Sequence, residues 1–376
     1  MIVQTSLSED FKHWQRFANG YFDPEQKDFA IPPAFDFVMN FADNGLAAVK
    51  QYRKWGYINI HEDMVIPAQF DDARGFTSNG LARVQQDGKW GYINDAGEMV
   101  ITEQFGDVYD FAENGIARVR HGGDWRYIDK KGQLIPSSPF KYALDFAENG
   151  LAVVKENGSY GFINDQGKIV IPLQFDFAHS FSNGLAAVSK NGTWGYINDA
   201  GKIVIAPQFD DAEKFTKNGI ARIQQNGKYG FINHHGKTVI AANLDWAGRF
   251  TDHELEVVQQ NRKVGFINGK GEIIIPLQFD FAHHFTENGL AAVRQGDQWG
   301  YIDMQGKMII PLQFDLADSF AENGLAAVKN NDHWGYINNA GEIVIKSDTV
   351  CNRLVIKNID EKIIWPRKTL AEICAE

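Results

Sequence analysis

The sequence repeats itself about every 35 residues, and this period limits the chain to a stack of similar small units. A Trp-Gly-Tyr-Ile-Asn box at residues 55–59 recurs at residues 90–94, and further copies follow at steps of 34 or 35 residues up to Trp334. Nine repeats are clear, and a partial copy precedes them, because residues 31–36 match residues 66–71 one period later. A unit of this length cannot bury two faces alone, so neighbouring repeats must stack on it.

Each repeat contains the pattern of a three-stranded meander. In one copy, residues 81–84, 90–94 and 98–101 are short β-rich runs separated by turn signals. The first turn holds Asp87-Gly88, a strong hairpin signal. The second turn begins with Asn or Asp in all nine repeats, and its Gly, Gly97 in this copy, is expected in the left-handed conformation.

A connector rich in aromatic residues ends each repeat. Phe70, Ala73 and Phe76 are spaced by three, which predicts one helical turn pinned into the core, with Asp71 as its cap. The Gly after the Trp leaves one side of its strand bare, so another backbone or ring can approach closely there. We expect the connector's Phe to fill that space.

We therefore expect an all-β fold made of about ten three-stranded antiparallel units of about 35 residues. An open, twisted solenoid or superhelix is favoured over a closed, propeller-like ring, because propeller blades have four strands in 40 or more residues and rings usually close at four to eight blades. The expected domains are an N-terminal helical cap over residues 1–20, the repeat array over 21–346, and a C-terminal cap of hairpin and helix over 347–376. The first cap rests on an amphipathic pattern over residues 7–18.

The open array has a measurable consequence in solution. Small-angle scattering is expected to show an elongated or superhelical particle, because an open stack lengthens with each added repeat. A flat ring in which the first and last repeats touch would contradict this prediction.

The repeated boxes resemble a known family. Lys-Trp-Gly-Tyr-Ile-Asn, Gly-Lys-Ile-Val-Ile-Pro, Gln-Phe-Asp and Asn-Gly-Leu-Ala recur in order over roughly residues 20–346 and are similar to the bacterial WG-repeat family, also called WG-containing β repeats. The resemblance implies a bacterial β-repeat protein of a family whose members mostly lack an assigned activity. The Trp-Gly-Tyr-Ile-Asn hairpin also resembles choline-binding cell-wall repeats, which stack hairpins into a solenoid.

Composition and charge narrow the classes of function. The net charge of −11 disfavours nucleic-acid binding, and no apolar run is long enough to span a bilayer. The first residues lack the pattern of a secretory signal, and the two cysteines, Cys351 and Cys374, form no disulfide framework. These features favour a cytoplasmic, monomeric protein that binds neither nucleic acid nor membrane.

The chemistry-bearing residue types do not form a catalytic or metal-binding motif. His179 and His283 share one position of the repeat, which is simply polar elsewhere, and no clustered Cys/His spacing is present. Paired carboxylates such as Asp71-Asp72 recur through the array, which indicates structural caps rather than an acid/base pair. We therefore expect no enzyme activity, no cofactor and no metal.

One repeat departs most from the pattern and supplies the candidate binding residues. Around residues 244–268 the shared Phe, the Asn-Gly pair and the Trp are lost, while Trp246, Arg249, His253 and Arg262 appear. This repeat is either a drifted copy or one that breaks the symmetry to form a contact site, since Trp and Arg are favoured interface anchors.

Three functions remain open. The first is a non-catalytic scaffold that binds a protein partner through its extended surface. The second is a cytosolic immunity or inhibitor protein, or a translocated bacterial effector, whose acidic surface would suit a basic partner. The third is a carbohydrate-binding or cell-wall-binding repeat protein.

Overall fold

The structure is a computed structural model of the 376-residue chain. It describes residues 15–17, 20–23, 28–32, 34–136, 139–248, 255–269, 272–321, 324–331, 333–350, 353–358 and 363–365. In this part of the chain every regular element is a β-strand, so the predicted all-β repeat array is confirmed. The same residues contain no helix with the length and apolar character needed to cross a membrane.

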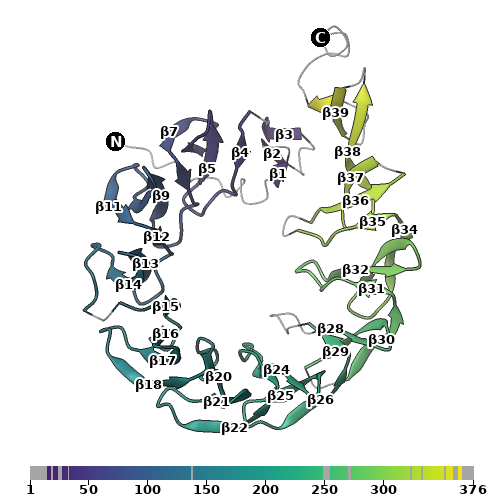
Figure 1. Ribbon diagram of the computed structural model, residues 1–376. Coiled ribbons are helices and arrows are strands. Elements are labelled where there is room, and N and C mark those ends of the chain that lie inside the picture. The colour runs from purple at the N-terminus through teal and green to yellow at the C-terminus, as the bar shows by residue number, and fades with distance from the viewer. Residues whose placement is uncertain are drawn as a thin grey trace, which may run out of the picture. The chain divides into compact units, whose positions relative to one another are not determined.

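Most repeats form a four-stranded antiparallel sheet rather than the three-stranded unit expected from the sequence. Among the described residues, seven of the ten sheets have four strands, in which neighbouring strands follow chain order. Their labels run through the chain in Figure 1, for example β20, β21 and β22 in teal. The extra strand has only two residues and lies at one edge of the sheet. Propeller blades also have four strands, so the number of strands does not distinguish these units from such blades.

The short edge strands lie in the connectors, and six of the nine directly follow a Phe-Asp pair. They are β4 (Phe37–Val38), β8 (Asp72–Ala73), β12 (Asp107–Val108), β15 (Tyr142–Ala143), β19 (Phe177–Ala178), β23 (Asp211–Ala212), β27 (Trp246–Ala247), β31 (Phe281–Ala282) and β35 (Leu316–Ala317). The second strands begin the predicted meander. They are β5 (Leu46–Gln51), β9 (Ala82–Gln86), β13 (Ile116–His121), β16 (Ala152–Glu156), β20 (Ala186–Lys190), β24 (Ile220–Gln225), β28 (Leu255–Gln260), β32 (Leu290–Gln295) and β36 (Ala326–Asn330).

The third strands carry the Trp-Gly box. They are β6 (Lys54–Asn59), β10 (Lys89–Ile93), β14 (Asp124–Asp129), β17 (Ser159–Ile163), β21 (Thr193–Ile197), β25 (Lys228–Asn233), β29 (Lys263–Asn268), β33 (Gln298–Asp303) and β37 (His333–Ile337). The fourth strands are longer and form the other edge. They are β7 (Met64–Phe70), β11 (Met99–Phe105), β18 (Ile169–Phe175), β22 (Ile203–Phe209), β26 (Thr238–Leu244), β30 (Ile273–Phe279), β34 (Met308–Phe314) and β38 (Ile343–Val350).

The chain ends add further strands. At the N-terminus β1 (Gln15–Phe17), β2 (Gly20–Asp23) and β3 (Asp28–Ile31) form a three-stranded sheet. Gln15–Phe17 is thus extended, and the rest of the predicted helix over residues 7–18 lies outside the described residues. At the C-terminus β39 (Arg353–Asn358) pairs with β38 and with β40 (Ile363–Trp365), which confirms the predicted hairpin. The helix predicted from Pro366 lies outside the described residues.

The chain divides into two compact units. The first comprises Met1–Asp87, Tyr92–Met99 and Phe281–Glu376, and the second comprises Gly88–Gly91 and Val100–Asp280. Each contains several consecutive sheets with their own buried clusters. The candidate surfaces described below are therefore taken one compact unit at a time.

The connector is extended, not helical. The backbone N–H of Asp71 donates to the carbonyl of Gln85, and that of Arg74 donates to Arg83, so the connector bonds to the next repeat instead of to itself. Asp72 and Ala73 accordingly form β8, paired with β9. The predicted burial of the three spaced residues holds, since Phe70, Ala73 and Phe76 are all buried.

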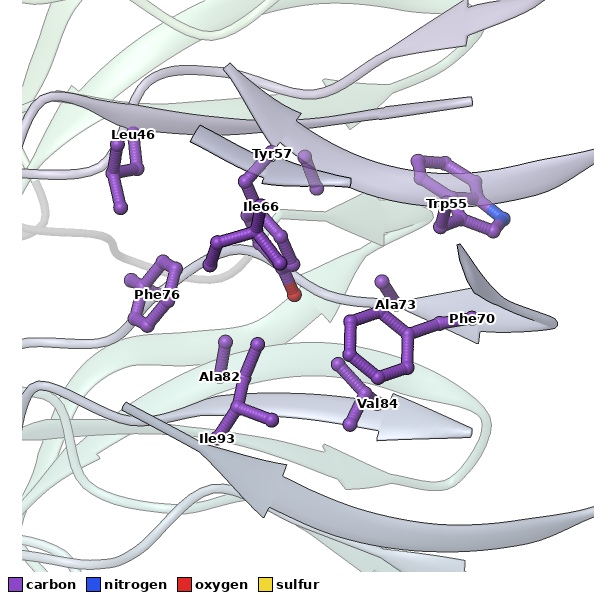
Figure 2. Close-up of a cluster of buried hydrophobic side chains, with 11 residues drawn as sticks. Leu46, Trp55, Tyr57, Ile66, Phe70, Ala73, Phe76, Ala82, Val84 and Ile93 are labelled. Atoms are coloured by element: carbon purple, nitrogen blue, oxygen red, sulfur yellow. The ribbon is translucent and has the colours of Figure 1, made fainter. Parts of the chain in front are cut away.

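The core lies between consecutive sheets, and Figure 2 shows one such layer. Tyr57 from one sheet packs against Phe76 from the next connector, with ring centroids 5.0 Å apart, and Ile93 closes the cluster. The Tyr57 hydroxyl donates to the carbonyl of Arg74 at 2.7 Å. Burial raises the pKa of this Tyr hydroxyl well above its usual range, so it remains a proton donor at all ordinary pH values.

The Gly of the Trp-Gly box is required by a backbone contact and not by a ring. In the β21–β22 pair, Trp194 lies opposite Phe209 and Tyr196 opposite Ile205, so a bulge of β22 arches over Gly195. A Cβ on Gly195 would lie 2.6 Å from the Ile205 carbonyl oxygen and 2.7 Å from the Pro207 nitrogen. The expectation that a connector Phe fills this space is therefore wrong.

The repeat that lacks this Gly also lacks the fourth strand. Arg126 stands in the Gly position of β14, and the sheet β12–β13–β14 has three strands. The described residues beyond β14 form only the isolated bridges Trp125–Phe140 and Ile128–Leu134. These two bridges have the same spacing as Trp194–Phe209 and Ile197–Ile203 in the β21–β22 pair, and residues 137–138 between them lie outside the described residues.

Candidate binding surface

The structure describes two of the four predicted binding residues. Trp246 is 41% exposed on the short strand β27, so it is a surface residue and not part of the core. Arg262 is exposed in the tight turn between β28 and β29, with a φ of 63°. Trp246 pairs with Gln259, which is close to Arg262 in the chain. Trp246 and Arg262 therefore lie toward the same end of the sheet. Arg249 and His253 lie outside the described residues.

The sequence analysis missed a buried carboxylate in the same repeat. Glu256 occupies a position that is Ala in the other eight clear repeats, and its side chain is fully buried. Its Oε1 accepts a hydrogen bond from the backbone N–H of Val257 at 2.9 Å. A comparison of this one position across the repeats would have revealed it.

Trp246 is one of a series of exposed apolar residues. The first position of the short strand is apolar in six repeats, and the exposed fractions of these side chains lie between 36% and 46%. The six residues are Phe37, Tyr142, Phe177, Trp246, Phe281 and Leu316. In the other three repeats the position holds Asp72, Asp107 and Asp211, so the fold does not require an apolar residue there.

Four of the exposed rings, those of Phe37, Tyr142, Phe177 and Phe281, lie against the aromatic residue of the Trp-Gly box in the same sheet, whereas the sheet of Trp246 has Val264 at that position. The Phe177 and Trp194 ring centroids are 5.7 Å apart, and Phe177 also lies 4.9 Å from Tyr160 of the preceding sheet. The Lys155 ammonium lies 4.6 Å from the Tyr160 ring centroid. The result is a partly exposed row of rings with a cation beside it, a combination common at interfaces.

The Asp that recurs in most connectors caps a hairpin turn of the next repeat, not the helical turn predicted for its own connector. Asp71 accepts the backbone N–H of Asp87 at 2.8 Å and the Lys54 ammonium at 2.6 Å. Asp245 accepts the N–H of Asn261 and the Lys228 ammonium in the same way. The Lys hydrogen bond, with the backbone N–H second, holds the pKa of each carboxyl below its usual range.

The repeated His position is used for stacking. His179 stacks on Trp194 with centroids 5.1 Å apart, and His283 stacks on Trp299 at 5.3 Å. Burial lowers the pKa of His283, so it is neutral near pH 7. Within the described ranges, no three His, Cys, Asp or Glu side chains are grouped so that they could hold a metal ion.

One connector is a residue shorter than the others and is pulled toward its next neighbour. Ser182 Oγ donates to the Phe215 carbonyl at 2.7 Å, and Asn183 Nδ2 donates to the Thr216 carbonyl at 2.9 Å. In the preceding, full-length connector Asn149 instead bonds locally, to the N–H of Leu151. The short connector is therefore bonded to the connector that follows it.

A crevice of about 660 Å³ runs along four successive connectors, the short one among them. It is lined by residues 109–114, 144–148, 150 and 180–182 together with Lys214, all in the second compact unit. We call it the connector crevice. Its volume is within the range of ligand-binding pockets. A second cavity, of about 270 Å³, lies along residues 213–216 and includes His179 and Arg222.

Comparison with protein families accounts for the repeats. The family described as WG containing repeat matches ten consecutive segments: 20–55, 55–90, 90–125, 125–160, 160–194, 194–229, 229–263, 265–299, 299–332 and 334–347. The chain belongs to the WG-repeat family. This WG-repeat protein is thus a repeat-containing, β-rich protein, and no curated protein sequence matches it.

Solved structures share parts of the fold. The crystal structure of the eukaryotic initiation factor is 11% identical with a TM-score of 0.51, covering 82% of this chain and 96% of that one. Dihydro-heme d1 dehydrogenase NirN is 13% identical with a TM-score of 0.38, covering 75% and 76%. Saccharomyces cerevisiae Sqt1 is 13% identical with a TM-score of 0.37, covering 70% and 91%. The first likeness concerns the fold alone, and the other two are too distant to carry an argument.

Proposed function

We propose that this WG-repeat protein is a non-catalytic, cytoplasmic scaffold that binds a protein partner through its extended surface. The supporting observation is the series of exposed rings at the first position of the short strands. Because Asp occupies that position in three repeats, packing does not explain the rings in the others. Exposed aromatic residues beside cations are the usual anchors of protein interfaces.

The repeated residues serve the fold and carry little information about a single partner. The box Tyr, the connector Phe and the capping Asp each satisfy a need that every repeat has. A partner that binds at one place must therefore use residues that differ between repeats. Trp246 meets this condition, because Trp stands at this position in this repeat alone, whereas the position of Arg262 is also Arg in another repeat, at Arg53.

The role of this repeat is tested with Trp246→Ala combined with Arg249→Ala. We expect the melting temperature to change little, because the Trp246 ring is 41% exposed. The affinity for a partner captured from the native host is expected to fall about tenfold or more. Affinity is measured with purified components, and melting is measured on the same preparation.

Leu316→Ala is the matched control, since Leu316 is 45% exposed at the same position of another repeat. We expect it to leave both quantities unchanged. A large drop in the melting temperature of the double variant would show that Trp246 belongs to the core. Its repeat would then be interpreted as a drifted copy. An unchanged affinity would remove this repeat from the binding surface.

A further inference from the structure

The connector crevice presents the same side chains at regular steps. Phe111, Phe146 and Phe181 hold equivalent positions in three successive connectors, and all three are buried along the crevice. Glu113 and Glu148 are also equivalent, are exposed, and form no ion pair with any described residue. The crevice is thus lined by three equivalent phenylalanine rings, which form its floor. Two of the three connectors that carry these rings also carry a glutamate.

The charge of the crevice is mainly negative. Asp110 and Asp145 add two carboxylates to those of the glutamates, although Asp145 is paired with Arg118 at 3.1 Å. Lys214, in the connector that follows the short one, is the one ammonium among the described lining residues. A cationic group is therefore favoured along most of the crevice and opposed near Lys214.

The step between connectors fits an extended chain. Stacked sheets lie about 10 Å apart, and an extended or polyproline chain advances about 3.1–3.4 Å per residue. Every third residue of such a chain therefore meets an equivalent point of the next connector. In polyproline geometry every third residue also points to the same side.

We propose that the connector crevice binds an extended basic peptide segment of a partner protein, with Arg or Lys at about every third residue. The proposal rests on the scaffold function and specifies the chemistry of its partner. Cationic groups would lie beside Glu113 and Glu148, and apolar residues between them would cover the phenylalanine floor.

The test uses a fluorescent nonapeptide made of three Arg-Leu-Pro units, with binding followed by fluorescence polarisation. A peptide of the same composition with its three arginines adjacent is the spacing control. We expect the spaced peptide to bind more tightly, and its affinity to fall as ionic strength rises. Equal binding of the two peptides would show that the spacing of the arginines does not match the spacing of the connectors, and would overturn the proposal.

Two sets of variants locate the binding site. Glu113→Gln with Glu148→Gln is expected to weaken binding about fivefold. The matched control is Asp43→Asn with Glu287→Gln, which removes two charges at the same connector position outside the crevice, and it should leave affinity unchanged. Equal losses in both double variants would show nonspecific attraction to an acidic protein and overturn the proposal.

A gain in affinity separates the proposal from simple damage to the fold. Lys214→Glu is expected to strengthen binding of the spaced peptide about threefold, because it replaces the repelling ammonium by a carboxylate. Unchanged or weaker binding by a folded Lys214→Glu variant would contradict the proposal. If the natural partner binds normally to the glutamate variants, the crevice inference fails while the scaffold function stands.

Discussion

Replacing Gly195 by valine is expected to destabilise the protein by about 3 kcal/mol. The new Cβ would lie 2.6 Å from the Ile205 carbonyl oxygen and 2.7 Å from the Pro207 nitrogen, and neither backbone atom can move without opening the bulge of β22. The high β-propensity of valine cannot offset a clash with backbone. Chemical denaturation, read as the shift in midpoint, measures the loss.

The chain offers a matched control for this substitution. Arg126 stands at the equivalent position of the sheet that has no fourth strand. Arg126→Val is therefore expected to change stability by about 1 kcal/mol or less. Similar losses from both substitutions would show that the Gly is retained for a reason other than the bulge.

Replacing Phe215 by alanine is expected to cost about 3–5 kcal/mol, the usual range for a buried Phe. Its ring is 1% exposed, lies 4.8 Å from the Tyr196 ring, and stacks on His234 with centroids 4.4 Å apart. It therefore packs side chains of two consecutive repeats together. Loss of the ring leaves a cavity between sheets, and the denaturation midpoint is expected to fall accordingly.

Phe177→Ala is the comparison for the connector Phe. The Phe177 side chain is 43% exposed, so its removal is expected to cost about 1 kcal/mol or less. This contrast separates aromatic residues that stabilise the array from those that face solvent. If both substitutions were equally costly, the exposed rings would be part of the core, and the observation behind the scaffold function would be lost.

The repeat, the strands of the meander and the turns were all predicted from the sequence, because these features depend on local periodicity. Trp90-Gly-Tyr-Ile lies in β10, and the turn that follows holds Gly97 at a φ of 80°, as expected. Period-two patterns and Asn-Gly or Asp-Gly turns act over a few residues, so one sequence is enough to place them. Each assignment is supported by nine clear copies of the pattern.

The connector shows where local reasoning failed. Phe70, Ala73 and Phe76 have a helical spacing, yet Asp72 and Ala73 form a strand because their partner strand is supplied by the next repeat. The Gly of the box was correctly read as a site of close approach, but the approaching group is a bulge of the neighbouring strand. Both outcomes depend on hydrogen-bond partners that lie many residues away in the chain.

Of the candidate binding surfaces, one was predicted from the sequence and the other was found only in the structure. Trp246 and Arg262 were found from the sequence because they break a repeated pattern, and the structure places Trp246 at the surface. The connector crevice could not be predicted, although the missing residue near Ser182 in one of its connectors is visible in the sequence. Whether a deletion tightens a loop or opens a cavity depends on which neighbour the loop then bonds. Here Ser182 and Asn183 bond to the following connector, and only the tertiary structure determines that choice.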